Sequence, residues 1–218
     1  LANRANQDLD DDMILREVAF FMQAGSHSSA NALTHSFHEI NKWCRRHPED
    51  RARLLTDDHF LQRCVHESLR LHPASPVAWR TASEAFSLPD GTDVAEGDSV
   101  VIDLMSANLE APLFGEDAEV FNPHRTVAAR IPPFGLSFGI GIHTCFGRDI
   151  AGGLGDAKTK GEAPHLGTLT NLLKNLMQHD ARPDLANPAV ADAGTERPNW
   201  GSYPLMIGQR STHAGAAI

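Results

Sequence analysis

The longest uninterrupted pattern in this sequence is a helical spacing of apolar residues over residues 10–45, and its length limits the possible folds. At about 1.5 Å per residue this helix is roughly 50 Å long. Asp10, Asp11 and Asp12 are favourable residues at its start, through capping and the helix dipole. Because both flanks of the apolar stripe are also fairly apolar, we expect the helix to lie centrally. The stripe comprises Val18, Phe21, Met22, Gly25, Ser29, Leu33, Phe37 and Ile40.

The middle of this helix, Ala24-Gly25-Ser26-His27-Ser28-Ser29, is small and polar. Glycine and serine in a buried helix lower its stability, and serine hydroxyls compete for backbone carbonyls. This stretch therefore predicts a local distortion or a site.

The rest of the chain predicts shorter elements. Asp57 or Asp58 opens a second helix that ends at His72-Pro73. Strand-like runs cover 77–86, 88–94 and 99–105, with turn signals between them. Residues 109–130 read as loop, 148–153 as a helix start, 152–167 as an inserted glycine-rich loop, 166–179 as a helix and 203–207 as a short strand. The predicted fold is mainly α with a small β region.

Composition excludes several classes of protein. The 218 residues carry a net charge of −9, which argues against a general nucleic-acid binder. No stretch of about 18 apolar residues predicts a membrane span. Three cysteines lie far apart without a CxxC pair, which favours a reducing compartment, and we expect a cytoplasmic location.

The segment around Cys145 carries the most chemical information. Glycines at 135, 139, 141 and 147 surround this cysteine, as expected where backbone turns sharply or approaches a ligand closely. A helix start just after Cys145 would favour its thiolate, and a thiolate held by backbone donors suits an axial iron ligand. The alternative is a glycine-rich turn with a buried, inert cysteine.

This segment resembles the haem-binding loop of the cytochrome P-450 family in its bacterial form. Six fixed positions match: Phe138, Gly139, Gly141, His143, Cys145 and Gly147. The resemblance implies that Cys145 is the proximal ligand of haem b, that His143 lies near a propionate, and that Phe138 packs under the haem. Gly139 and Gly147 are then part of the cofactor-binding loop.

Further segments agree in type and order. Glu67-Ser68-Leu69-Arg70 resembles the ExxR helix of the family, whose two charges share one helix face. Arg125 in Phe121-Asn122-Pro123-His124-Arg125 is the expected third member of this ion pair, since a buried pair needs further partners. Arg80 matches a position that holds a haem propionate. Taken singly, each pattern favours an ordinary surface charge, but their order before a matching cysteine loop favours the family assignment.

The long first helix resembles the oxygen-binding helix of the family, whose usual form is Ala-Gly-x-acid-Thr. Here Gly25 is kept, His27 replaces the acid and Ser28 replaces the threonine. Histidine can carry protons near neutral pH, so these three residues are candidates for catalysis. The alternative is that His27 points away from the haem into a polar contact.

Other patterns give weaker predictions. His38-Glu39 and His66-Glu67 begin like HExxH, but each lacks the second histidine. Cys44 and Cys64 read as packed apolar side chains. A basic stretch from Lys42 to Arg63 is either a solvated face balanced by nearby acids or a docking surface for an acidic redox partner.

The resemblance covers nearly the whole chain but only the C-terminal half of the P-450 fold. We therefore expect residues 1–218 to be one partial haem domain, cut at Leu1, without its N-terminal half. No GxGxxG precedes a helix, so we expect no fused reductase; electrons from NAD(P)H would arrive through a separate ferredoxin or a flavin/iron–sulfur reductase. The implied reaction is oxygen insertion from dioxygen into a small organic substrate.

Two other functions stay open, namely a peroxide-driven peroxygenase on the same scaffold and a truncated, non-catalytic chain that binds haem poorly. The tail from Arg197 to Pro204 and the glycine-rich insert after Cys145 resemble bacterial members that demethylate methoxylated aromatics.

Overall fold

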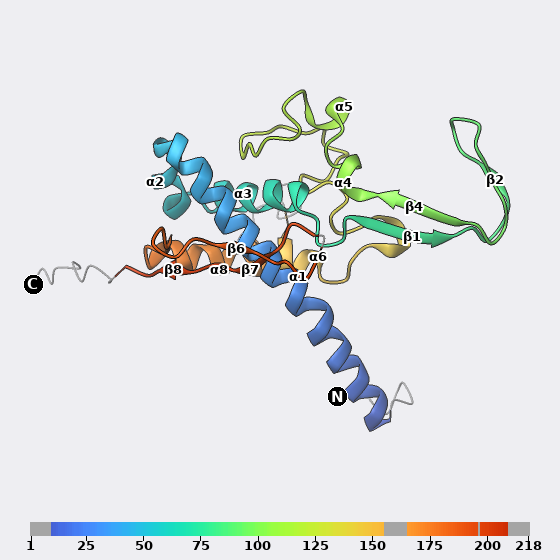
Figure 1. Cartoon of the computed structure of the whole chain (residues 1–218), viewed down its shortest axis with the longest axis horizontal. Helices are drawn as coiled ribbons and strands as arrows, with labels where there is room; N and C mark the ends of the chain where they lie inside the picture. Colours follow the sequence, from blue (N-terminus) through green and yellow to red (C-terminus); the bar gives the residue numbers. More distant parts are fainter. Residues whose placement is uncertain (1–9, 155–164, 196, 209–218) are drawn as a thin grey trace, which may run out of the picture.

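The computed structural model describes residues 10–154, 165–195 and 197–208 (Figure 1). The inserted loop predicted over 152–167 lies largely outside these ranges. Within them, the helices are α1 (Asp11–Arg46), α2 (Pro48–Thr56), α3 (Asp58–Leu71), α4 (Leu104–Ala107), α5 (Ala111–Phe114), α6 (Arg148–Gly152) and α8 (Gly167–Gln178). A single 3-10 turn covers Gly141–His143. Helices thus dominate, as predicted.

The strands form small antiparallel pairs. β1 (Val77–Thr81) pairs with β4 (Ser99–Asp103), and β2 (Phe86–Ser87) with β3 (Asp93–Val94). β5 (Arg182–Pro183) pairs with β8 (Leu205–Met206), and β6 (Val190–Ala191) with β7 (Trp200–Ser202). Figure 1 shows the β1–β4 ribbon reaching out from the helices, with β2 at its far end. The sequence did not predict β5 or β6.

The long helix α1 has almost the predicted ends. Asp10 caps it, since its carboxylate accepts a hydrogen bond of 2.7 Å from the Met13 N–H. The helix is unbroken through residues 24–29. The Ser28 hydroxyl donates a hydrogen bond to the Ala24 carbonyl oxygen at 2.9 Å, so its donor is paired within its own helix. The distortion that the small polar stretch predicted is therefore not found.

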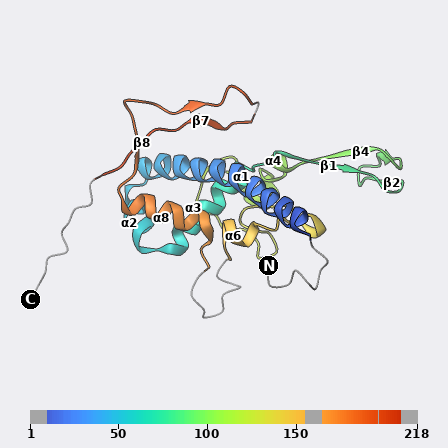
Figure 2. The same ribbon diagram turned by 90° about the horizontal axis from the view of Figure 1, so that it is seen from below.

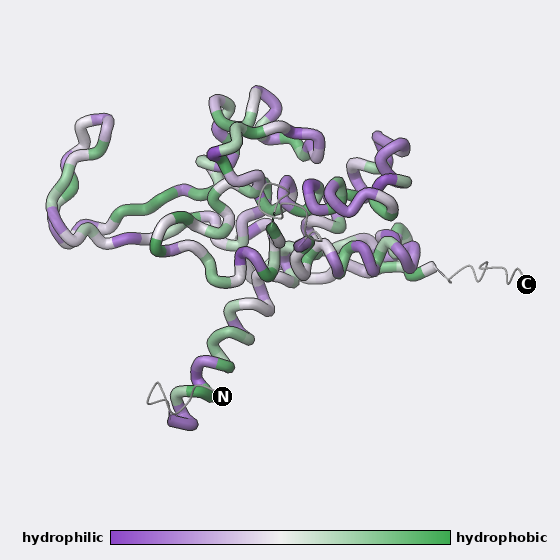
Figure 3. Tube along the Cα trace, turned by 180° about the vertical axis from the view of Figure 1, so that it is seen from behind, coloured by the Kyte–Doolittle hydropathy of each residue, from purple (hydrophilic) through white to green (hydrophobic). Residues whose placement is uncertain are grey.

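The prediction that α1 is central along its whole length is wrong. In the first half, Val18, Phe21 and Met22 are exposed, and Figure 1 shows this half projecting beyond the other elements. Figure 3 shows apolar residues along it. The second half is buried, because α3 and α8 pack against it.

The core lies between the second half of α1, α3 and α8. Buried side chains from all three elements meet there, which explains why these helices stay together in a chain with only small sheets. The main contributors are Phe37, Ile40, Phe60, Leu61, Cys64, Val65, Leu169 and Leu173.

Helix α3 begins and ends as predicted, with Asp57 accepting a bond of 2.9 Å from the Phe60 N–H and His72 at the C-cap. The sequence analysis missed α2. Pro48 ends α1, but it also stands at the first position of a new helix, where its fixed φ and missing N–H cost nothing. The short helices α4 and α5, at the end of the third strand-like run and in the predicted loop, were missed as well.

The C-terminal strands lie on the side of α1 away from α6. Figure 2 shows β7 on the side of α1 opposite α6, and the Trp200 ring of β7 packs on the His38 ring of α1 with centroids 4.9 Å apart. In the described ranges, no helix is both long and apolar enough to cross a membrane.

Candidate functional site

The backbone around Cys145 turns through glycines that no other residue replaces easily. Gly139 has φ +66°, and a Cβ there would lie 2.7 Å from the His143 carbonyl oxygen. Gly135 has φ +58°, and a Cβ there would lie 2.1 Å from the Asn108 side-chain oxygen. Positive φ and these short distances both require glycine. The Cys145 N–H donates to the Phe138 carbonyl oxygen at 2.7 Å, which closes the loop.

The loop presents its sulfur and apolar side chains outward. Cys145 and His143 are exposed, and Ile142 and Phe146 are 96% and 91% exposed. A Cβ at Gly147 would lie 3.8 Å from Cys145 Sγ, an ordinary contact, so packing in this structure does not require glycine there. The surface beside the sulfur is therefore apolar and open to a ligand.

The other two cysteines differ sharply from Cys145. Cys44 and Cys64 are buried in the core, as predicted for packed apolar side chains. Burial raises the pKa of Cys44 to about 11 and raises that of Cys64 well above its ordinary value. Neither can serve as an accessible thiolate. The donor set available to a soft metal on this surface is thus a single sulfur, which fits the axial ligation of a haem iron.

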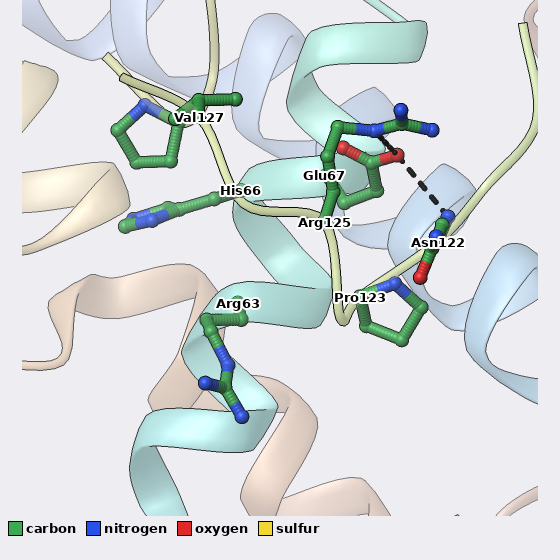
Figure 4. A pocket seen from close by; sticks show the side chains of 8 residues that line it. Arg63, His66, Glu67, Asn122, Pro123, Arg125 and Val127 are labelled. Carbon is green, nitrogen blue, oxygen red and sulfur yellow. Dashed lines mark hydrogen bonds and ion pairs between the residues drawn. The ribbon is translucent and has the colours of Figure 1, made fainter. Parts of the chain in front are cut away.

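The structure brings Glu67, Arg70 and Arg125 together, and Figure 4 shows Glu67 beside Arg125. Arg70 donates to both carboxylate oxygens of Glu67, from Nε at 2.8 Å and from Nη2 at 2.7 Å. Arg125 Nε donates to Glu67 Oε1 at 3.0 Å. Glu67 and Arg70 are 4% and 0% exposed, so each charge depends on its partners.

Additional donors and acceptors complete this group. The Asn122 N–H donates to Glu67 at 3.1 Å, and Arg125 also pairs with Asp117 at 2.6 Å. Arg125 donates further to the carbonyl oxygens of Phe114, Asp117 and Val120. Every charge is hydrogen-bonded, as a buried group of this kind requires.

Asn108 connects this ion pair to the cysteine loop, and the sequence analysis did not single it out. It is fully buried at the end of α4. Its Nδ2 donates to the Arg70 carbonyl oxygen at 3.0 Å and to Ser137 Oγ at 3.2 Å, while its Oδ1 accepts from the Leu136 N–H at 2.7 Å. Arg70 Nη1 in turn donates to the Asn108 carbonyl oxygen at 2.6 Å. A lone asparagine after a short apolar run carries no pattern that would have revealed this role.

Phe138 and Ser137 tie the loop to the core. Phe138 packs edge-to-face on Phe134 with ring centroids 5.0 Å apart, and Ser137 Oγ donates to the Leu69 carbonyl oxygen at 2.6 Å. The segment that precedes Cys145 is therefore hydrogen-bonded to the end of α3.

The remaining predicted site residues lie apart from this group. In the described ranges, no hydrogen bond or ion pair joins Gly25, His27, Ser28 or Arg80 to the Cys145 segment. His27 and Gly25 are exposed on the projecting half of α1, and Arg80 donates to the Trp79 carbonyl oxygen within β1 at 2.7 Å.

The basic stretch is partly balanced. Arg53 pairs with Asp50 at 3.3 Å and with Asp57 at 2.9 Å, and Lys42 pairs with Glu39 at 3.7 Å. Across the described residues, no cluster of three His, Cys, Asp or Glu side chains is arranged to hold a metal ion.

The sequence model of the cytochrome P450 family matches residues 1–152, from before α1 through the Cys145 loop and α6. The chain belongs to the cytochrome P450 family. It is 29% identical over 168 residues to human Cytochrome P450 4F11, covering 66% of this chain and 31% of that protein. It is 31% identical over 138 residues to the Mycinamicin VIII C21 methyl hydroxylase of Micromonospora griseorubida, covering 63% of this chain and 33% of that protein.

Solved structures of cytochromes P450 share the fold. That of CYP102L1 has a TM-score of 0.68 at 22% identity, covering 92% of this chain and 46% of that one. That of CYP109E1 from Bacillus megaterium, in complex with corticosterone, has a TM-score of 0.69 at 20% identity, covering 91% and 47%. This P450 chain spans about a third of the curated relatives named above and about half of these structures.

Proposed function

We propose that this protein is a haem-thiolate monooxygenase that inserts one oxygen atom from dioxygen into a small organic substrate. The proposal depends chiefly on one observation. Cys145 is the exposed cysteine of three, and it stands in a glycine loop that Asn108 fastens to the buried Glu67–Arg70 pair. Such a loop can hold a sulfur ligand in a fixed direction with little reorganisation.

In this proposal Cys145 is the axial ligand of haem b. The residues proposed to surround the cofactor are Phe138, Gly139, His143, Gly147 and Arg80. When bound, haem supplies the oxidising chemistry, and the protein supplies binding, orientation and protons. The exposed apolar side chains of Ile142 and Phe146 offer a surface for an apolar macrocycle, and the cationic side chain of Arg80 suits a carboxylate.

Proton delivery is assigned to His27 and Ser28. An imidazole gains and loses a proton near neutral pH, and a serine hydroxyl both donates and accepts hydrogen bonds. In this structure the Ser28 hydroxyl is turned to the Ala24 carbonyl oxygen. A rotation about one side-chain bond frees it to pass on a proton.

Electrons are proposed to come from NAD(P)H through a separate ferredoxin or a flavin/iron–sulfur reductase. The basic stretch from Lys42 to Arg63 suits an acidic partner of this kind, since charge complementarity speeds encounter. We propose no narrower substrate class than a small organic molecule. The relatives named above give no support to O-demethylation of a methoxylated aromatic, which was suggested by the tail from Arg197 to Pro204 and the glycine-rich insert after Cys145.

A spectrum and a turnover assay on the haem-loaded protein test this proposal together. We expect the red-shifted carbon monoxide difference band of a thiolate-ligated haem and product formation that requires the reductase. Cys145→Ala removes both, whereas the matched control Cys44→Ala keeps the band because that sulfur lies in the core. A Cys145→Ala variant that retained the band and the turnover would refute the assignment.

The second candidate function is a peroxygenase, favoured by the exchange of an acid and a threonine for His27 and Ser28. If the same preparation turns over with hydrogen peroxide and not with any ferredoxin and reductase pair, despite a normal thiolate band, the peroxygenase is the correct function.

A further inference from the structure

Two polar side chains of α3 that the proposed function does not use reach the backbone just after the cysteine loop. Gln62 and His66 lie one helical turn apart and are 4% exposed each. His66 Nε2 lies 2.7 Å from the Gly152 carbonyl oxygen at the end of α6. Gln62 Nε2 lies 3.3 Å from the same oxygen and 3.1 Å and 3.2 Å from the carbonyl oxygens of His165 and Leu166. One face of α3 thus donates hydrogen bonds to the end of α6 and to the two residues that precede α8.

The chemistry of these contacts fixes the direction of the hydrogen bonds. A backbone carbonyl oxygen only accepts, so Nε2 of His66 carries the proton and donates. Burial lowers the pKa of His66 and keeps the imidazole neutral, although the bond to Gly152 opposes that shift. The Gln62 amide likewise donates, and its two N–H hydrogens are shared among the three carbonyl oxygens. The Gly152 carbonyl oxygen is buried, and leaving it without these donors would lower stability.

His66 also contacts the segment before Cys145. Its ring packs edge-to-face on Phe134 with centroids 5.4 Å apart, and Phe134 packs in the same way on Phe138. Phe138 accepts the Cys145 N–H. One histidine therefore touches the backbone after the cysteine and the aromatic pair before it.

The backbone at the end of α6 has little room for larger residues. A Cβ at Gly152 would lie 3.2 Å from the Phe138 ring. Gly153 has φ +76°, and a Cβ there would lie 2.5 Å from Gln62 Nε2. Helix α6 begins three residues after Cys145, and the Ala151 N–H of α6 donates to the Gly147 carbonyl oxygen at 2.8 Å. A shift of α6 would therefore move the cysteine.

We propose that Gln62 and His66 are positioning residues that hold α6 against α3 and thereby set the direction of the Cys145 sulfur toward the haem iron. This proposal rests on the assignment of Cys145 as the axial ligand. It is separate from the Glu67 group, because Figure 4 shows His66 and Glu67 leaving α3 in different directions.

The experiment compares four variants of the haem-loaded protein. His66→Phe keeps an aromatic ring but removes the N–H donor to Gly152, and His66→Gln restores a donor. Gln62→Leu removes the amide donor of the second residue. Val65→Ala is the matched control, because it loosens the core on α3 and removes no hydrogen-bond donor. The readouts are hydrogen exchange at the amides of Ala151, Gly153 and Leu154, and the fraction of the carbon monoxide complex that keeps the thiolate band.

We expect His66→Phe and Gln62→Leu to speed exchange at these amides about tenfold, the effect of losing one net hydrogen bond. Both variants should also convert part of the carbon monoxide complex to the form without thiolate, and His66→Gln should return both readouts toward those of the unmodified protein. If His66→Phe does not fold, the same two readouts on Gln62→Leu test the proposal.

Unchanged exchange in both variants would overturn the proposal, as would an equal effect from Val65→Ala. Faster exchange with a fully retained thiolate band would also overturn it, because α6 would then be held without any consequence for the sulfur. If the unmodified protein itself lacks the thiolate band, the proposed function fails instead, while hydrogen exchange still reports whether α3 holds α6.

Discussion

Asn108 shows how one side chain can join two parts of a site that are distant in sequence. Its amide reaches α3 through the Arg70 carbonyl oxygen and the cysteine loop through Ser137 and Leu136. An amide is suited to this place because it donates and accepts at once, without adding a charge beside the buried Arg70. The Glu67 ion pair and the loop are therefore one hydrogen-bonded unit.

We predict that Asn108→Leu lowers the free energy of unfolding by roughly 2–4 kcal/mol, because three hydrogen bonds are lost and buried partners are left without them. Urea unfolding followed by circular dichroism measures the change. Asn175→Ala, at an exposed position on α8, is the control and should change stability by less than about 0.5 kcal/mol. Equal midpoints for the two variants would contradict the role given to Asn108.

At the scale of elements, α1 and α3 meet through stacked histidines. His35 on α1 and His72 at the end of α3 lie with ring centroids 4.3 Å apart and an interplanar angle of 9°. Burial, and next the neighbouring His72, lower the pKa of His35 from 6.5 to about 4, with Asn199 and Glu39 acting in the opposite direction. A charge on His35 would be buried beside the His72 ring and would weaken the contact between these helices.

This shift predicts how stability depends on pH. Between pH 6.5 and about pH 4 the unfolded chain binds a proton at His35 that the folded chain does not. The free energy of unfolding therefore falls as the pH is lowered through this window, by up to about 1.4 kcal/mol per pH unit from this group. Stability is full above the window.

Unfolding by urea at several pH values from 7 to 4 tests the prediction. His35→Gln should flatten the pH dependence, while His165→Gln, at an exposed position outside the stack, controls for the loss of a histidine. The same slope in His35→Gln as in the unmodified protein would show that the stacked pair does not set it.

At the scale of the whole molecule, α1 joins a buried half to an exposed one. From Ala32 onward its side chains enter the core, whereas its first half exposes large apolar residues to solvent, namely Met13, Leu15, Val18, Phe20, Phe21 and Met22. Isolated helical turns are marginally stable in water, so the first half depends on the second for its order.

We predict that amides of residues 17–27 in the 218-residue chain exchange hydrogen at least about a hundredfold faster than those of residues 36–44, since they lack packing in the described structure. Hydrogen exchange read by mass spectrometry after proteolysis compares the two halves within one sample, so each chain is its own control. Equal protection along α1 would contradict the prediction.

Local patterns were sufficient for much of this protein. The apolar spacing of α1, the caps at Asp10 and Asp57, and the glycines around Cys145 depend on neighbouring residues, so the sequence alone determined them. The family resemblance added the partnership of Glu67, Arg70 and Arg125, which no spacing rule would give, because Arg125 lies 55 residues beyond Arg70.

The tertiary structure decided the rest. It placed Asn108 and His66 against the cysteine loop, left the first half of α1 uncovered, and began α2 at Pro48. These outcomes depend on which surfaces meet in space. A buried polar side chain finds its partners among distant backbone groups, and an apolar stripe is buried only where another element packs on it.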